Sequence, residues 1–143
     1  MKDILWIYLL DYSGSSILIY INDQEQIEKP NRSVVSHFLY GLKEAAGEFE
    51  EDEINIMVLD NALFFLIEEP VTNSILVLKS KLQSNTELVS QKLRTIKEGF
   101  VQKFGEKANV LQHEREKLFS SFKMEVKQLI SPLENNDLLK NKN

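Results

Sequence analysis

Residues able to do catalytic or metal chemistry are few in this chain, and they stand apart. The two histidines, His37 and His113, lie in different predicted helices and in no H-E-x-x-H or similar ligand spacing. We expect His37 to be a partly buried structural histidine and His113 to be solvated. The chain has no cysteine, which excludes a thiol nucleophile, a disulfide framework and a thiolate metal site. The pattern favours a protein that is not an enzyme and has no metal or cofactor.

Two other polar segments have simple structural interpretations. The acidic residues within 48–53 could attract a divalent cation, but they lack the alternating D-x-D-x-D-G pattern of a calcium loop, so we expect a solvated loop. Residues 13–16, with the sequence SGSS, resemble a phosphate-binding turn only superficially, because such turns lead from a strand into a helix. Here a second strand-like run follows. We therefore expect a hairpin turn.

Three aromatic residues could stack on nucleic-acid bases, as aromatic side chains do on binding sheets. Trp6, Phe64 and Phe65 lie inside apolar runs that have no interleaved lysine or arginine. We expect them in the core and predict no nucleic-acid partner.

Length and composition indicate one ordinary globular domain. The chain has 143 residues, of which 43% are hydrophobic and 27% charged. We expect a single domain over residues 1–134 and a disordered polar tail over 135–143. The apolar run 4–10 is too short to span a bilayer and lacks the features of a signal peptide, so the expected location is cytoplasmic.

Charge is distributed unevenly along the chain. Residues 1–78 hold four basic and 14 acidic side chains, whereas residues 79–143 hold 13 basic and eight acidic ones. The simple interpretation is that amphipathic helices show lysine and glutamate to solvent. The alternative is that the basic helices meet an acidic partner or an anionic membrane surface, with at most peripheral membrane association.

The apolar segments follow a definite order. We expect two strands, a helix, three strands and two helices, over residues 4–10, 17–21, 33–49, 54–59, 62–67, 74–78, 84–105 and 119–133.

Local signals set the ends and turns of these elements. Asp60 and Asn61 predict a tight hairpin turn, because both tolerate positive φ. Ser84 and Glu87 have the spacing of a capping box at the start of the second helix. Gly41, inside the first helix, suggests close approach to a strand.

Several strands are apolar on both faces. Residues 4–10 and 74–78 do not alternate polar with apolar, so both their faces need cover, and only the three helices can provide it. The fold class is therefore α/β, a three-layer α/β/α sandwich with residues 4–10 as a central strand. The first helix must cross over the sheet.

The order of elements resembles the longin domain, which is found in vesicle-trafficking proteins such as longin SNAREs, the small (sigma) subunits of clathrin adaptors and sedlin-type tethering subunits. The resemblance is carried by the hairpin over 4–21, the helix with Phe38-Leu39-x-x-Leu42, the hairpin around Asp60-Asn61, the strand 75–78 and the helix 88–104. It implies a mixed five-stranded sheet in the order 2-1-5-4-3, with the first helix on one face and the last two on the other.

The resemblance also implies a function. Longin domains are not enzymes: they bind SNARE segments, longin or roadblock subunits, or small GTPases, often through the first helix and the edge of the third strand. In this chain that partner-binding surface maps to Val35, Leu39, Leu42, Ile54, Ile56 and Val58. We expect a stand-alone, scaffold-like subunit in vesicle trafficking or small-GTPase regulation, because no SNARE segment or anchor follows the last helix.

Alternatives remain open at this point. A PAS-like sensor that binds a small ligand also has two strands, helices and three strands, but the segment 24–49 is short for the several helices usual there. A roadblock domain normally has a helix before the first strand. The apolar stripe of Phe119, Phe122, Val126, Leu129 and Leu133 could be internal or could be the seam of a homo- or heterodimer.

Overall fold

The computed structural model describes residues 3–11, 16–22, 32–105, 117, 119 and 121–130. The elements follow the predicted order: β1 (Ile4–Asp11), β2 (Ser16–Ile21), α1 (Arg32–Ala46), β3 (Ile54–Leu59), β4 (Ala62–Glu69), β5 (Ser74–Lys81) and α2 (Thr86–Phe104). A further helical segment covers residues 123–130. His113, the turn residues 13–15 and the tail 135–143 lie outside the described residues.

The five strands form one sheet in the order β2-β1-β5-β4-β3, which confirms the predicted order. The expectation of a mixed sheet is wrong, because all four neighbouring pairs are antiparallel. A helical crossover usually joins parallel neighbours. Here α1 joins β2 to β3, which do run in the same direction but lie at opposite edges of the sheet, so they never become neighbours.

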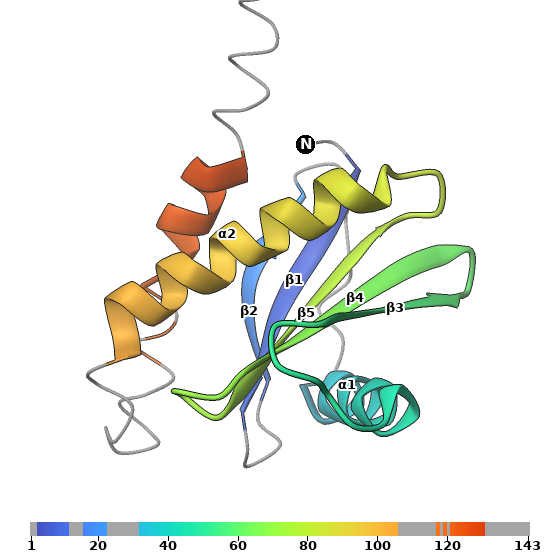
Figure 1. Ribbon diagram of the computed structural model, residues 1–143, viewed down its shortest axis with the longest axis horizontal. Helices are drawn as coiled ribbons and strands as arrows, with labels where there is room; N and C mark the ends of the chain where they lie inside the picture. The colour runs from blue at the N-terminus through green and yellow to red at the C-terminus, as the bar shows by residue number, and fades with distance from the viewer. Residues whose placement is uncertain are drawn as a thin grey trace, which may run out of the picture.

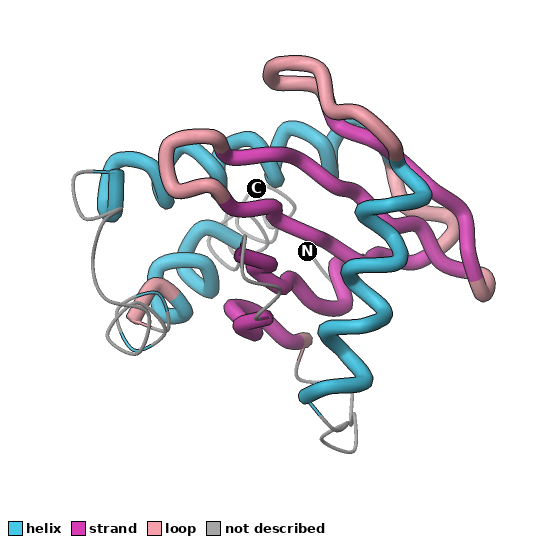
Figure 2. Tube along the Cα trace, turned by 90° about the horizontal axis from the view of Figure 1, so that it is seen from below, coloured by secondary structure: helices cyan, strands magenta, loops and turns pink. Residues whose placement is uncertain are grey.

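Helices cover both faces of the sheet, as Figures 1 and 2 show. On one face, α2 and the helical segment 123–130, together with Phe119 and Phe122, cover a core that contains Ile7, Phe65 and Leu78. On the other face, α1 covers a second core with Trp6, Phe64 and Val77. The α/β/α sandwich is therefore confirmed, with a separate apolar core in each interface.

The first strand is central, as its unbroken apolar run predicts. It lies between β2 and β5, and Tyr8 alone among its residues is not buried. Leu5 and Trp6 both belong to the α1-side core, although successive strand residues normally point to opposite faces. The pairing with β5 shifts register between Ile4 and Trp6. This bulge lets a run without alternation supply both cores.

The turn and cap predictions have mixed outcomes. Asp60 and Asn61 have φ of 51° and 59°, which confirms the tight turn between β3 and β4. The predicted Ser84 cap is wrong: Asn85 is the N-cap of α2 and accepts a hydrogen bond from the backbone N–H of Leu88. Ser84 instead donates its hydroxyl to the carbonyl of Lys81 at 2.6 Å, which closes the turn after β5.

Helix α1 differs in two ways from its prediction. It ends at Ala46 rather than near residue 49, because Gly47 takes a φ of 76°, outside the range of a right-handed helix. The interpretation of Gly41 is also wrong. A Cβ added there would meet nothing within 4 Å, so the position faces open space and not a strand.

The stripe that could have been a dimer seam packs inside the domain. Phe119, Phe122 and Val126 are fully buried in the α2-side core, and Leu129 packs against it. The rings of Phe119 and Phe122 lie 5.0 to 5.7 Å from those of Phe100 and Phe104 on α2. Leu133 lies outside the described residues. The described part of the stripe is therefore internal.

Candidate interaction surface

The predicted surface on α1 is mostly core. Leu39 and Leu42 are buried in the α1-side cluster, and Val35 packs against it. Helix α1 contacts β1 and β2. The apolar stripe of an amphipathic helix normally faces the core of its own domain, which here is the sheet. The expectation that Leu39 and Leu42 contact a partner is therefore wrong for this structure, and these two residues hold α1 in place.

The predicted surface on β3 lies on the opposite side of the sheet. Directly paired residues share a face, and the predicted residues of β3 pair with residues of the α2-side core: Ile54 with Ile67, Ile56 with Phe65 and Val58 with Leu63. Helix α1 lies on the other face. The structure thus does not bring the six predicted residues together into one surface.

Two of the predicted β3 residues are well exposed. The exposed fraction is 44% for Ile56 and 68% for Val58, whereas Ile54 packs against the α2-side core. Leu59, which pairs with Ala62 of the α1-side core, is also exposed, at 39%. The end of β3 therefore presents apolar side chains from both faces of the sheet.

Sequence reasoning missed the α1-side half of this region. Phe38 is 37% exposed, and its ring lies 5.6 Å from that of Phe64 on β4. Met57, which is opposite Phe64 in the ladder, is partly buried against the same core. Periodicity places Phe38 on the apolar stripe of its helix. It cannot show that the sheet leaves part of this stripe exposed.

A polar group on β3 also lacks a partner. The side-chain Nδ2 of Asn55 is buried and makes no hydrogen bond among the described residues. Asn55 pairs with Leu66, so it belongs to the α1 side of β3. A buried donor without an acceptor destabilises a fold by about 1–3 kcal/mol.

The edge of β3 is open to further strand pairing. β3 pairs with β4 through six consecutive residues without a register shift, and no described strand lies on its outer side. Its sequence, INIMVL, has neither lysine nor proline. An unbulged apolar edge strand is the usual template for adding a strand from another chain.

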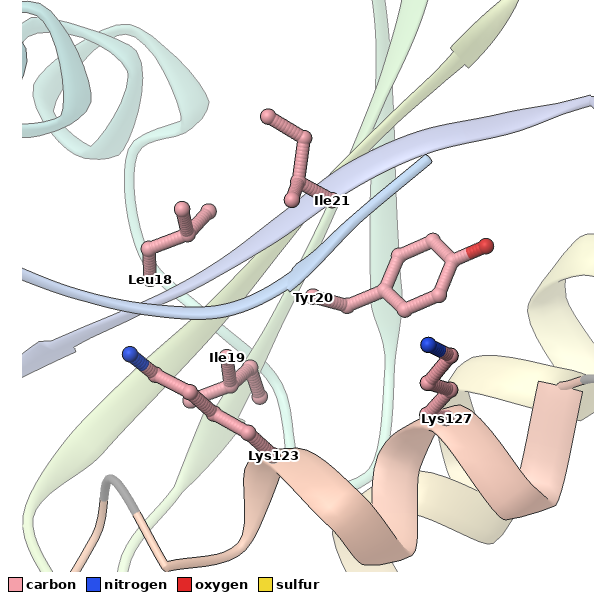
Figure 3. A pocket seen from close by; sticks show the side chains of 6 residues that line it. All are labelled: Leu18, Ile19, Tyr20, Ile21, Lys123 and Lys127. Atoms are coloured by element: carbon pink, nitrogen blue, oxygen red, sulfur yellow. The ribbon is translucent and has the colours of Figure 1, made fainter. Parts of the chain in front are cut away.

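The other edge of the sheet differs. β2 shifts register against β1 between Ile7 and Tyr8, so Ile19 is an extra residue in the ladder. A groove of about 230 Å³ runs beside β2, lined by Leu18, Ile19, Tyr20, Ile21, Lys123 and Lys127. Both lysines extend from the 123–130 helix toward the strand (Figure 3). Bulges and lysines are devices that protect sheet edges, so β3 is the accessible edge.

Carboxylates surround the start of β3. Glu50, Glu51, Asp52 and Glu53 are all exposed, which confirms the solvated acidic loop. Lys97 Nζ on α2 lies 2.7 Å from Asp52 Oδ1, and this hydrogen bond and charge lower the pKa of the Asp52 carboxyl below its usual 3.8. A hydrogen bond shared with Glu50, and the charge of Glu50, raise the pKa of Glu53. The loop thus has one carboxylate that is paired with a lysine, Asp52, and two neighbouring carboxylates, Glu50 and Glu53, whose charges repel.

Histidine and carboxylate side chains are the candidates for metal or catalytic chemistry in this chain. His37 is exposed on α1, so the prediction that it is partly buried is wrong. Among the described residues, no three histidine, cysteine, aspartate or glutamate side chains are grouped as a metal site would require. No helix in the described part of the chain is long and apolar enough to cross a membrane.

Comparison with known proteins leaves the chain without a family assignment. No model of a known family matches it, and no curated protein matches its sequence.

Proposed function

We propose that this protein is a non-enzymatic interaction module that binds another protein by adding one of its strands to the β3 edge. The observation that carries the proposal is the state of β3: an outermost strand, unbulged, with Ile56, Val58 and Leu59 exposed on its two faces. Main-chain hydrogen bonds would supply affinity, and the alternating side chains would supply specificity.

The biological setting is proposed from the likeness in architecture. The order of elements and the strand order 2-1-5-4-3 are those expected of a longin domain. On that basis we propose a cytoplasmic subunit in vesicle trafficking or small-GTPase regulation. Its partner would be a small GTPase, a longin or roadblock-type subunit, or a SNARE-like segment.

The proposed surface is smaller than the one mapped from sequence. Ile56 and Val58 remain in it, joined by Leu59 and by the side chains on the α1 side, Met57 and Phe38. Leu39 and Leu42 are left out because they are buried.

The proposal is tested by replacing Ile56 with arginine. A charged side chain on an edge strand opposes pairing with another strand, so Ile56→Arg should abolish partner capture in an affinity purification from the native cell. Met124→Arg is the matched control, because Met124 is as exposed as Val58 but lies on the 123–130 helix. Circular dichroism should show both variants folded.

Two outcomes would count against the proposal. If Ile56→Arg keeps its partners while Met124→Arg loses them, the binding surface lies on the C-terminal helix. If native mass spectrometry of the purified protein reveals a retained small molecule, the alternative of a PAS-like ligand sensor is favoured.

A further inference from the structure

We infer that the strand that β3 accepts carries lysine or arginine at both of its ends, and that β3 of a second copy of this chain is not the occupant. The inference rests on the proposed function, since it concerns the partner of the same edge. It goes further by naming the chemistry of that partner.

Both ends of β3 carry exposed carboxylates. Glu53 directly precedes Ile54, and Asp60 directly follows Leu59. Glu50 and Glu51 add charge to the first end. None of these four carboxylates forms an ion pair with a described residue. Any strand laid along β3 therefore ends beside negative charge, whether it runs parallel or antiparallel.

Among the described residues, the ion pairs leave most of this charge uncompensated. Lys97 pairs with Asp52, and Lys103 pairs with Glu125 at 2.5 Å. Near the first end of β3, the neighbouring carboxylate of Glu50 raises the pKa of Glu53. Cationic side chains from a partner would both relieve this repulsion and steer the approach of the partner strand.

The same charges oppose self-pairing. In an antiparallel pair of β3 strands, Glu53 of each copy would approach Asp60 of the other. In a parallel pair, each carboxylate would approach its own counterpart. Like charges opposite one another destabilise a ladder. The flanking acids thus protect an apolar edge that would otherwise be prone to self-association.

The experiment uses the full chain and three synthetic peptides with one common core of six alternating valine and threonine residues. The peptides differ only at their ends, which carry two lysines, two serines or two glutamates. Fluorescence anisotropy measures binding at low salt and at about 0.5 M salt, where charge effects are screened. Light scattering measures the mass of the free chain.

The lysine-ended peptide should bind about tenfold tighter than the serine-ended peptide at low salt, and high salt should largely remove the difference. The glutamate-ended peptide should bind most weakly. In the double variant Glu53→Gln, Asp60→Asn the preference for lysine should be lost. Glu87→Gln with Glu98→Gln, two exposed changes on α2, is the matched control and should retain it.

Other outcomes separate this inference from the proposed function. Equal binding of the three peptides, abolished by Ile56→Arg, would overturn the inference on charge and leave strand addition intact. No binding of any peptide would count against strand addition itself. A dimer of the wild-type chain that Ile56→Arg dissociates would show that the second copy is the occupant.

Discussion

Ile56 on β3 and Phe65 on β4 are opposite one another in the antiparallel ladder, yet Ile56 is 44% exposed and Phe65 is fully buried. The two side chains share a face of the sheet. Helix α2 contacts β4, and its cover of this face of the sheet ends between β4 and β3. One step across the sheet thus separates a core residue from a surface residue.

This pair predicts unequal costs for the same truncation. Phe65→Ala should lower the free energy of unfolding by about 3–5 kcal/mol, because it leaves a cavity in the α2-side core. Ile56→Ala should cost less than about 1 kcal/mol, since the side chain is half in solvent. Chemical denaturation of both variants provides the measurement. Similar costs at the two positions would mean that β3 is covered in solution.

Glu69 organises the turn between β4 and β5. Its buried carboxylate accepts hydrogen bonds from the backbone N–H groups of Val71 and Thr72, at 2.9 and 2.6 Å, and from the Thr72 hydroxyl. Glu69→Gln replaces one acceptor oxygen with a donor, so we expect a loss of about 1–3 kcal/mol in stability. Glu68→Gln, at the exposed neighbouring position, is the control and should change little. Equal effects in a thermal melt would contradict the structural role of Glu69.

Because of Lys92, the free energy of unfolding should depend on pH in the alkaline range. It is buried on α2, and burial lowers the pKa of its ammonium below the usual 10.5. The unfolded chain therefore holds this proton to higher pH than the folded protein does, and stability rises with pH between the folded pKa and 10.5. Below that window, burying the charge destabilises the fold.

Lys92→Met should consequently be more stable than the wild type at neutral pH. The difference should shrink as the pH rises through the folded-state pKa toward 10.5. Urea denaturation of both proteins over this pH range measures the difference directly. A constant difference at all pH values would indicate that Lys92 keeps its ordinary pKa in the folded state.

The aromatic cluster predicts that the C-terminal helical segment is part of the domain. Phe122 is fully buried and contacts the rings of Phe100 and Phe104 at 5.6 and 5.7 Å. Phe122→Ala should cost about 3–5 kcal/mol. Met124→Ala, two residues away and exposed, should change stability by about 0.5 kcal/mol or less. If Phe122→Ala were equally mild, the segment would not be packed on α2 in solution.

Much of the fold could be predicted because it depends on local patterns. The unbroken apolar run of β1 required a central strand with cover on both faces, and the structure has both. Asp60 and Asn61 required a tight turn, because few other residue types accept positive φ at both positions. Less local features were missed. The cap fell on Asn85 rather than Ser84, because the Ser84 hydroxyl is engaged with Lys81 across the preceding turn.

The candidate site could be predicted only in part. The pattern of α1 shows that Leu39 and Leu42 lie on its apolar face, but periodicity cannot tell a face buried by the same chain from one that awaits a partner. The sequence by itself determined the order of the elements, the apolar character of β3 and the acids at its ends. Only the tertiary structure decided that β3 is an open edge and that Ile56 and Val58 lie on the face of the sheet that α1 does not cover. Strand pairing and helix cover depend on contacts between segments distant in the chain.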